Sequence, residues 1–490
     1  MKILIITEGS REIGFGHITR CTSIYQAFED RGEAPVFIVN GDESAKSLFA
    51  GKKAEIFDWT KEIGRLESII EKADIIAVDS YTAGIEFYRK FCSASKTVLF
   101  IDDFNRLEYP GGTVLNGTIY AEEIPYKLKN ALKYLLGVKY MPLRREFWKT
   151  KEPAIKNNIE TIMVTFGGDD FGNVTPKVLK FLCAKYPGIS KKVVIGGGFR
   201  NKAEIKAAAD KNTELVENLD ASEMAQLMAS VELAISAGGQ TLYELAAVGV
   251  PAISVQVADN QKHNVEGWEK AGFTKHVGNH KDPGLIDNIT AAIRFYEGKE
   301  ERIRSSAIGR AFCDGRGCER VIKIILSDRF RTSLIIRPMV SGDSRKVFDL
   351  ANDEVVRNWS YSSSKIDWEA HQKWFAGKIN DTNCVFFAVE ADGNFAGQVR
   401  FDIMPEDSSA VIGISIAKEM RGLGLSSFIL EKALNEFRKL ARPDVETVKA
   451  YIKNENTASM KAFEHAEYEF SQEVVVKGRK SKLYIRKLTA

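Results

Sequence analysis

The sequence predicts two α/β lobes followed by an α+β domain, and three observations lead to this fold class. Apolar runs rich in Val and Ile alternate with amphipathic stretches over residues 1–148. After a polar segment at 149–158 the alternation restarts, and beyond about residue 330 it gives way to antiparallel-looking strands. Apolar strands separated by helical stretches are typical of a parallel sheet with helices on both faces. A chain of 490 residues has room for roughly three domains of ~150 residues each.

We expect the first lobe to span 1–148, the second 149–327 and the last domain 333–490. Candidate strands of the first lobe are Lys2–Thr7, Ala34–Val39, Ile75–Asp79 and Thr97–Ile101. Those of the second are Thr161–Phe166, Lys192–Ile195, Glu214–Val216, Leu233–Ser236 and Ala252–Ser254. The last domain has candidate strands at Ser333–Arg337, Val385–Ala391, Gly397–Ile403, Val411–Ile416 and Thr447–Ile452, and a helix at Ser427–Leu440. Two lobes of this kind favour a ligand site in the cleft between them.

Composition and charge exclude several function classes. A net charge of +3 argues against nucleic acid or a membrane surface as partner. No apolar run approaches the ~18 residues that span a bilayer, and Met1 leads directly into a strand, so we expect neither a membrane segment nor a signal peptide. The six cysteines are scattered without metal-site spacing. Free thiols in a reducing cytoplasm are the simplest interpretation.

The most informative motif follows the first strand and reads Gly14-Phe15-Gly16-His17-Ile18-Thr19-Arg20. A strand, a glycine turn and a helix start form a phosphate- or sugar-binding corner in α/β folds. The motif lacks the third glycine of a dinucleotide fingerprint and the lysine of a P-loop, which argues against NAD and ATP. Histidine is the side chain whose unperturbed pKa suits proton transfer near neutral pH. A structural histidine is the alternative interpretation.

Two more glycine turns follow strands of the second lobe. They read Gly167-Gly168-Asp169-Asp170 and Ala237-Gly238-Gly239-Gln240-Thr241. Backbone N–H groups at a helix start can hold a diphosphate without metal. Glu244, one turn into the following helix, could accept hydrogen bonds from ribose hydroxyls, and Asn260 follows the next strand. Each feature alone also fits a plain tight turn or a helix cap, but the set in this order is more specific.

Residues 1–327 resemble the UDP-sugar hydrolase of the pseudaminic acid pathway. That family has two Rossmann-like lobes in a glycosyltransferase-B-like (GT-B-like) arrangement and is related to the lipid-intermediate GlcNAc transferase of peptidoglycan synthesis. The matching strings are Gly14–Cys21, Asp79-Ser80-Tyr81, Ile101-Asp102-Asp103, Thr165–Asp169, Ser236–Leu245 and Ala258–Gln261. They lie in both lobes.

The resemblance implies hydrolysis of UDP-2,4-diacetamido-2,4,6-trideoxy-β-L-altropyranose to UDP and the free sugar, without a metal. His17 would position or deprotonate the attacking water. The implied substrate- and UDP-binding residues are Gly14, Gly16, Arg20, Tyr81, Gly167, Gly168, Asp169, Gly238, Gly239, Thr241, Glu244 and Asn260. Because UDP is a good leaving group, one base and amide donors suffice for this chemistry. A paired-carboxylate glycosidase is disfavoured, since the adjacent Asp102 and Asp103 would point to opposite faces of a strand.

Residues 333–490 resemble the GNAT N-acetyltransferase family, an α+β fold. A glycine loop opens a helix at Ser427, and consecutive amides there would cradle a diphosphate. The residues that the resemblance assigns to acetyl-CoA are Arg421, Gly422, Leu423, Gly424, Leu425, Ser426 and Asn456. Two residues depart from the family pattern. Ser426 stands where Gly or Ala is usual, and Phe463 stands where many members carry the tyrosine that protonates the departing thiolate. Water or Tyr468 could substitute, and Glu354, Glu390 and Asp402 are open candidates on the amine side.

The pathway contains an acetyltransferase step, on the 4-amino group of UDP-4-amino-4,6-dideoxy-N-acetyl-β-L-altrosamine, immediately before the hydrolase step. The two resemblances together therefore imply a bifunctional enzyme for consecutive reactions, with a UDP-sugar and acetyl-CoA as small-molecule partners. Three alternatives remain open. The first part could be a UDP-sugar-dependent glycosyltransferase with an accessory GNAT domain. The chain could also be a non-catalytic UDP-sugar- and acetyl-CoA-binding protein, or carry a degenerate GNAT fold kept for assembly.

Overall fold

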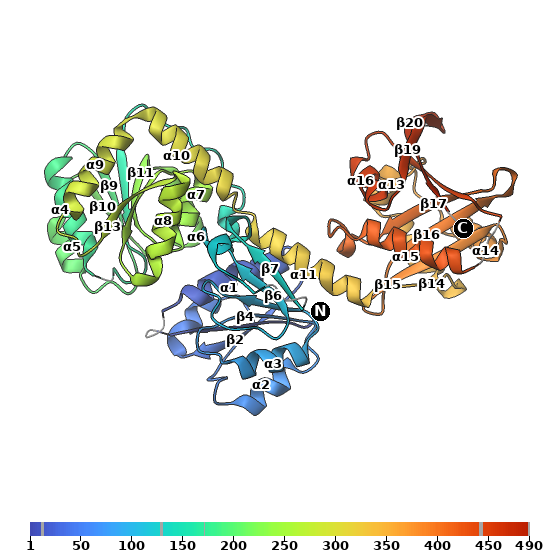
Figure 1. Ribbon diagram of the computed structural model, residues 1–490, viewed down its shortest axis with the longest axis horizontal. Coiled ribbons are helices and arrows are strands. Elements are labelled where there is room, and N and C mark those ends of the chain that lie inside the picture. The colour runs from blue at the N-terminus through green and yellow to red at the C-terminus, as the bar shows by residue number, and fades with distance from the viewer. Residues whose placement is uncertain (11–13, 128–130, 171, 441–443, 489–490) are drawn as a thin grey trace. The chain divides into compact units, whose positions relative to one another are not determined.

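The computed structural model (Figure 1) describes residues 1–490 except 11–13, 128–130, 171, 441–443 and 489–490. The chain divides into two compact units, Met1–Ile322 and Lys323–Ala490. The first unit holds two separate sheets, and the second holds one. Among the described residues, no helix combines the length and the apolar character needed to cross a membrane.

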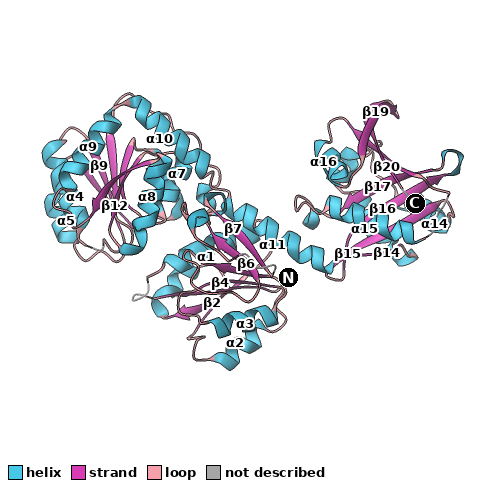
Figure 2. Cartoon of the chain, viewed as in Figure 1, coloured by secondary structure: helices cyan, strands magenta, loops and turns pink. Residues whose placement is uncertain are grey.

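The first sheet has seven strands in the order β3-β2-β1-β4-β5-β6-β7, and all its neighbours are parallel. Its strands are β1 (Ile3–Gly9), β2 (Val36–Gly41), β3 (Ala54–Ile56), β4 (Ile75–Asp79), β5 (Val98–Ile101), β6 (Gly112–Asn116) and β7 (Leu132–Leu136). Helices α1 (Gly16–Glu29), α2 (Ile63–Ile70) and α3 (Ile85–Ala94) connect strands of this sheet (Figure 2). Every residue of β1 and β4 is buried, as strands covered on both faces require.

The chain order reverses between β1 and β4, which lie side by side with Thr7 opposite Asp79. In open α/β sheets, ligands bind beyond the carboxyl ends of the strands at such a topological switch point. The histidine motif follows β1, and the Asp79-Ser80-Tyr81 string ends β4. The topology alone therefore brings these two segments to one edge of the sheet.

The second sheet repeats this plan with six parallel strands in the order β10-β9-β8-β11-β12-β13. They are β8 (Thr161–Thr165), β9 (Ser190–Ile195), β10 (Thr213–Glu217), β11 (Leu233–Ala237), β12 (Ala252–Gln256) and β13 (Thr274–Asn279). The helices are α4 (Val174–Lys185), α5 (Lys202–Ala208), α6 (Ala221–Ala229), α7 (Thr241–Val248), α8 (Lys262–Ala271), α9 (Leu285–Glu297) and α10 (Lys299–Phe312). The switch point lies between β8 and β11, and both glycine turns of this lobe follow these two strands.

The third sheet has the order β14-β15-β16-β17-β18-β20-β19 and is mostly antiparallel. Its strands are β14 (Ile335–Pro338), β15 (Cys384–Ala391), β16 (Asn394–Met404), β17 (Ser409–Ile416), β18 (Thr447–Lys453), β19 (Glu469–Val476) and β20 (Arg479–Lys487). The helices are α12 (Ser344–Ala351), α13 (Glu354–Trp359), α14 (Trp368–Asn380), α15 (Ser426–Lys439) and α16 (Thr457–His465). Helix α11 (Gly317–Ser333) contains the division between the two units.

The predicted fold class is confirmed, with two parallel α/β lobes and an α+β domain. Six strands went unpredicted, namely β3, β6, β7, β13, β19 and β20. Four of the six (β3, β7, β13 and β19) lie at sheet edges, where one side of the strand meets solvent and the apolar pattern weakens. The lobe boundaries at 148, 327 and 333 stay predictions.

Candidate active site

His17 lies in the first turn of α1, and a carboxylate at the end of β4 fixes its ring. The His17 Nδ1 atom is 2.8 Å from Asp79 Oδ1, and the Asp79 side chain is fully buried. Burial alone would raise the pKa of Asp79, but the charge of Arg20 and the hydrogen bonds from His17 and Arg20 outweigh it and lower that pKa well below its ordinary value. An ionised carboxylate can only accept, so Nδ1 carries the hydrogen. This tautomer leaves Nε2 as the basic nitrogen of the neutral ring.

Arg20, one turn after His17, ties two carboxylates together. Its Nε and Nη2 donate to the two oxygens of Asp79 at 2.8 and 2.7 Å, and Nη1 donates to Asp103 Oδ2 at 2.5 Å. Asp103 follows β5, the strand next to β4. The fork geometry of a guanidinium suits such bidentate pairing. The sequence prediction included Arg20 but assigned no role to Asp79 or Asp103.

Tyr81 packs against the same imidazole. Its ring meets the His17 ring edge to face, with centroids 4.5 Å apart, and its hydroxyl donates to Asp103 Oδ2 at 3.4 Å. Burial, followed by the charge of Asp103, raises the pKa of Tyr81. The phenol is therefore a neutral hydrogen-bond donor at any physiological pH. The residue remains 40% exposed, so a ligand can reach it.

The fold itself demands only some of the predicted glycines. Gly14 and Gly167 have φ of +84° and +79°, a region that favours glycine. By contrast, a Cβ at Gly16 or Gly168 would meet no atom within 4 Å, and one at Gly239 would meet only Gln261 Nε2 at 3.9 Å. These three have ordinary φ and follow β1, β8 and β11 at the two switch points. Packing therefore does not require glycine at these three positions, and each leaves room for a ligand to approach the backbone closely.

The turn between β11 and α7 is held by two side chains that the sequence prediction missed. Gln261 Oε1 accepts from the N–H of Gly238 and of Val257, both at 3.1 Å. Asn264 Nδ2 donates to Gly238 O at 2.8 Å. The Gly238 N–H is thus already used, and the donors that remain at the start of α7 are those of Gly239, Gln240 and Thr241. The Ala258–Gln261 string is one of those that carry the family resemblance, but nothing in the sequence indicates that Gln261 holds this turn.

The other glycine turn of this lobe does not open a helix directly. Helix α4 begins only at Val174, and Asp170 Oδ1 accepts from the N–H of Val174 at 3.1 Å and of Thr175 at 3.2 Å. The predicted residue Asp169 is exposed instead and lies over Gly198, whose backbone N–H donates to Gly168 O at 3.0 Å. The run Gly196–Gly198 after β9 supports this turn, and three consecutive glycines after a strand were a visible signal for it.

Glu244 and Asn260 differ in environment. Glu244 is buried and accepts from Arg144 Nη2 at 2.9 Å. Its pKa is raised because burial outweighs the attraction of Arg144. Asn260 lies in a short 3-10 turn after β12 and is exposed. Thr241 is the first residue of α7. Their assignment to UDP stays a prediction.

A chain of hydrogen bonds joins the two lobes at the β11–α7 turn. The backbone N–H of Ile119, which follows β6, donates to Tyr243 Oη at 2.9 Å. Tyr243 Oη hydrogen-bonds Asn264 Oδ1, and Asn264 in turn binds Gly238. Tyr243 is fully buried, so its hydroxyl needs both partners. The glycine turn of the second lobe is thereby anchored to the first.

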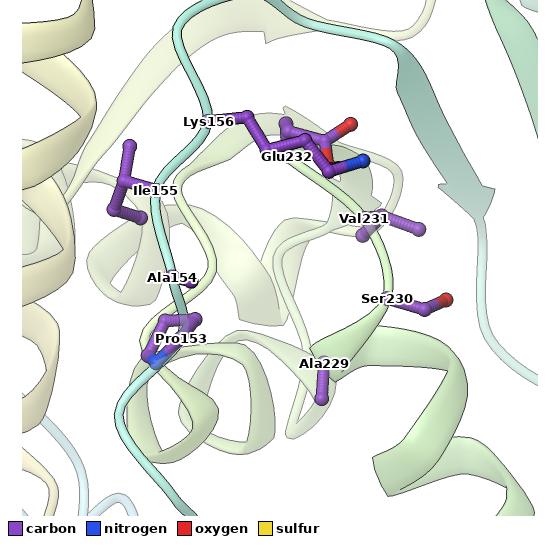
Figure 3. Close-up of a pocket in the computed structure, with 8 residues that line it drawn as sticks. All are labelled: Pro153, Ala154, Ile155, Lys156, Ala229, Ser230, Val231 and Glu232. Carbon is purple, nitrogen blue, oxygen red and sulfur yellow. Dashed lines mark ion pairs between the residues drawn. The ribbon is translucent and has the colours of Figure 1, made fainter.

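A pocket of the second lobe lies away from all predicted site residues (Figure 3). It is lined by Pro153–Lys156 and Ala229–Glu232, and a 2.9 Å ion pair joins Lys156 to Glu232. These segments precede β8 and β11, so the pocket is at the amino ends of the strands, opposite the glycine turns. No group of three or more His, Cys, Asp or Glu placed to hold a metal ion occurs in the described part of the chain.

In the second unit, the predicted acetyl-CoA loop runs from β17 to α15. Strands β17 and β18 pair only through Ser409–Val411 and Thr447–Lys449. Gly422 and Gly424 have φ of +74° and +72°, and a Cβ at either would meet no atom within 4 Å. Leu423 and Leu425 are buried, so only their backbone could reach a ligand, and Ser426 begins α15. A turn with free space above two glycines at a helix start fits a diphosphate.

Two predicted cofactor residues are already engaged within the protein. Arg421 forms a 2.8 Å ion pair with Asp353 and donates from Nε to Ile416 O. Asn456 caps α16 by accepting from the N–H of Ser459 at 3.1 Å. In the last turn of α11, Arg331 reaches the loop, where its Nη2 lies 3.5 Å from Gly424 O and its guanidinium covers the Phe428 ring at 5.1 Å.

Most candidate acid and base groups of this unit are buried or already hydrogen-bonded within the protein. Phe463 is buried, and its ring meets that of Tyr468 edge to face at 5.0 Å. Tyr468 is also buried, its pKa is raised by burial, and its hydroxyl has no hydrogen-bond partner among the described residues. Glu390 accepts from Arg337, and Asp402 accepts from Lys378 and Arg400. Glu354 is exposed at the start of α13.

Comparison with known families and proteins matches both units. Residues 161–297 match the glycosyltransferase family 28 C-terminal domain, and residues 333–469 match the acetyltransferase (GNAT) domain. A protein of Helicobacter pylori, described as pseudaminic acid cytidylyltransferase and UDP-2,4-diacetamido-2,4,6-trideoxy-beta-L-altropyranose hydrolase, is 26% identical over 56% of this chain and 48% of its own length. The spore coat polysaccharide biosynthesis protein SpsG of Bacillus subtilis is 24% identical over 66% of this chain and 98% of its own length. This chain is a homologue of both, with a C-terminal GNAT domain.

Two further similarities complete the comparison. An uncharacterized protein of Methanocaldococcus jannaschii is 24% identical over 80% of this chain and 81% of its own length. Among solved structures, spermidine N-acetyltransferase of Vibrio cholerae in complex with CoA and spermine has a TM-score of 0.29 and 19% identity, covering 32% of this chain and 96% of that one. The family matches and the sheet topology together establish the second Rossmann-like lobe and the GNAT domain.

Proposed function

We propose that the first unit hydrolyses UDP-2,4-diacetamido-2,4,6-trideoxy-β-L-altropyranose to UDP and the free sugar. The observation that carries this proposal is the His17 imidazole, held by the ionised Asp79 with Nε2 as its basic nitrogen. The homologous Helicobacter protein, whose description includes this hydrolase activity, supports the choice of substrate. The second unit would transfer an acetyl group from acetyl-CoA to the 4-amino group of the precursor, UDP-4-amino-4,6-dideoxy-N-acetyl-β-L-altrosamine.

In the hydrolytic step, His17 Nε2 takes a proton from water while the water oxygen bonds to the anomeric carbon. The bond between that carbon and the β-phosphate oxygen breaks, and its electron pair leaves with UDP. Asp79 stabilises the imidazolium that forms, as the carboxylate of a catalytic triad does. The N–H groups of Gly239, Gln240 and Thr241 would stabilise the departing diphosphate, and Glu244 would hold the ribose. A general base of this kind contributes about 10²–10⁴-fold.

In the acetylation step, the free space over Gly422 and Gly424 fits the diphosphate of acetyl-CoA, which supplies an activated acetyl thioester. The loop amides and the start of α15 would bind that diphosphate. Phe463 has no proton to give, and the hydroxyl of Tyr468 lies in the core of the domain. We therefore assign protonation of the departing thiolate to water rather than to Tyr468.

The two reactions would be consecutive, because a pocket shaped for a 4-acetamido group leaves polar partners unmatched against a bare ammonium. Unmatched buried polar groups cost roughly 1–3 kcal/mol. That penalty corresponds to about one or two decades in rate. UDP release from the 4-amino precursor should therefore be slow until acetyl-CoA is added.

The decisive experiment uses NMR to follow the reaction of the full-length chain with the UDP-diacetamido sugar, in the absence of any acceptor. We expect stoichiometric UDP and free sugar, with the same rate in EDTA, because amide donors do the work of a metal in this scheme. A second reaction with the 4-amino precursor and acetyl-CoA should yield CoA, UDP and the diacetamido sugar. UDP release only when an acceptor alcohol is supplied would identify a glycosyltransferase instead.

A further inference from the structure

A buried carboxylate at the end of β1 has no part in the scheme above. Glu8 is fully buried, yet all of its hydrogen-bond donors come from one short segment after β4. Its Oε1 accepts from the N–H of Tyr81 at 2.7 Å and of Thr82 at 3.3 Å. Its Oε2 accepts from the hydroxyls of Ser80 at 2.6 Å and Thr82 at 2.5 Å. Charge-assisted bonds of this kind are stronger than neutral ones, and four of them define the position of the segment.

The clamped segment carries one side chain of the candidate site. Asp79 immediately precedes it, and Tyr81 is its middle residue. The carbonyl of Ser80 is fixed as well, since it accepts from Arg106 Nη2 at 3.0 Å. The main chain of Tyr81 is thus immobilised on both sides, while its ring projects onto the His17 imidazole and its hydroxyl reaches Asp103.

We infer that Glu8 is the positioning residue for Tyr81 and, through that ring, for the His17 imidazole. This inference rests on the proposed hydrolysis. Asp79 fixes one nitrogen of the imidazole, and the Tyr81 ring blocks rotation from the side. Two restraints of different origin then fix the direction of Nε2. Because misplacing a reacting group by about 1 Å can cost 10²-fold in rate, the effect of Glu8 belongs in kcat rather than in UDP binding.

The test compares Glu8→Gln with Glu8→Ala in the full-length chain. The Gln carbonyl can accept from the Tyr81 and Thr82 amides, while its NH₂ donates to the Thr82 hydroxyl, which can rotate to accept. We expect Glu8→Gln to keep kcat within about threefold, and Glu8→Ala to lower it about 10- to 100-fold. UDP affinity by calorimetry should stay unchanged in both. If Glu8→Ala does not fold, Glu8→Asp, which keeps the charge but is one methylene shorter, takes its place with the same expected loss.

Glu232→Ala is the matched control. Glu232 is also a buried carboxylate that accepts from main-chain N–H groups, of Glu160 at 3.1 Å and Thr161 at 2.8 Å, but it lies beside the pocket of Figure 3. It should lower thermal stability without lowering kcat. If Glu8→Ala loses activity only in proportion to a similar loss of stability, the inference is wrong.

A double-mutant cycle with Tyr81→Ala tests the route of the effect. If Glu8 acts through Tyr81, Glu8→Ala should cost nothing further in the Tyr81→Ala background. Additive losses would overturn the inference. The aromatic NMR signals of Tyr81 and His17 give a readout independent of turnover, and they should shift in Glu8→Ala but not in Glu8→Gln. Unshifted signals would contradict the positioning role, whereas absence of UDP release in the wild type would contradict only the proposed function.

Discussion

The carboxyl ends of β1 and β4 in the first lobe hold the same place in their sheet as those of β8 and β11 in the second, but they carry opposite chemistry. The first switch point gathers ionisable groups around His17, with Asp79 and Arg20 buried against one another. The second offers uncharged backbone donors at Gly239 and neighbouring residues, held by the amide side chains of Gln261 and Asn264. In the proposed scheme, the switch point of each sheet sets where the ligand binds, and the side chains there decide whether the site reacts with the ligand or only holds it.

This contrast has a physical basis in what each step needs. Proton transfer needs a group whose charge changes, and such a group must be oriented by fixed charges. Binding a departing diphosphate needs donors that are already in place and do not reorganise. Substitutions that affect one switch point and spare the other test this contrast.

The largest effect is expected for His17→Asn. Hydrolysis should fall about 10²–10⁴-fold or more, because the base is lost. UDP affinity should stay nearly unchanged, since the proposed nucleotide contacts lie in the second lobe. Turnover assays and calorimetric titration with UDP check the two halves of this prediction. Comparable turnover in the variant would remove His17 as the base.

The comparison also applies to the second unit, where the glycine loop lies between the end of β17 and the start of α15. Gly424→Asp should reduce acetylation about 100-fold, because a carboxylate would stand against the CoA diphosphate, while hydrolysis of the already acetylated substrate continues. Gly478→Asp is the matched control, since Gly478 has a similar φ of +76° and equally open surroundings in the β19–β20 hairpin. Equal losses in both variants would point to backbone strain rather than to cofactor contact.

Gly239→Ala should raise the dissociation constant for UDP about tenfold, which corresponds to about 1.4 kcal/mol. The melting temperature should not change, because no atom of the protein lies closer than 3.9 Å to the added Cβ. Gly188→Ala, an equally open glycine of this lobe just before β9, should leave both unchanged. If Gly239→Ala binds UDP normally, the amides of this turn do not contact the nucleotide.

A smaller effect concerns stability and pH at the first switch point. The folded pKa of Asp79 lies below its unfolded value of about 3.9, because Arg20 and His17 outweigh the opposing effect of burial. Its stabilisation is therefore complete above the unfolded pKa and is lost as the pH falls through the folded pKa. The difference in unfolding free energy between wild type and Asp79→Asn should shrink as the pH falls below 4. Urea titrations at several pH values measure it, and a difference that grows on acidification would contradict the prediction.

The sequence allowed the local parts of both sites to be predicted. A strand, a glycine turn and a helix start lie within a few residues of one another, so His17, Gly238 and the Arg421–Ser426 loop could be found from their order alone. Their partners could not, because these come from other strands. Asp79 lies 62 residues from His17, and Glu8 lies 73 residues from Tyr81. Only the register of β1 against β4 brings them together.

Some misses had a visible signal. The run Gly196–Gly198 follows a predicted strand as closely as the other glycine turns do. Asp170 stands beside Asp169 in the sequence, and its distance of four residues from Val174, the start of α4, suits a capping side chain. The sequence predicts that Glu244 binds the ribose hydroxyls. It does not indicate the ion pair with Arg144, because the two residues are 100 positions apart.

Helix α11 has a practical consequence for dividing the protein. The boundary between the two compact units falls within this helix, and Arg331 in its last turn contacts Gly424 and Phe428 of the glycine loop. A fragment that begins at Ser333 would discard that arginine together with the helical turn that presents it. A recombinant GNAT domain should therefore start near Lys323, where the second unit begins, so that the helix end is expressed with the loop it touches.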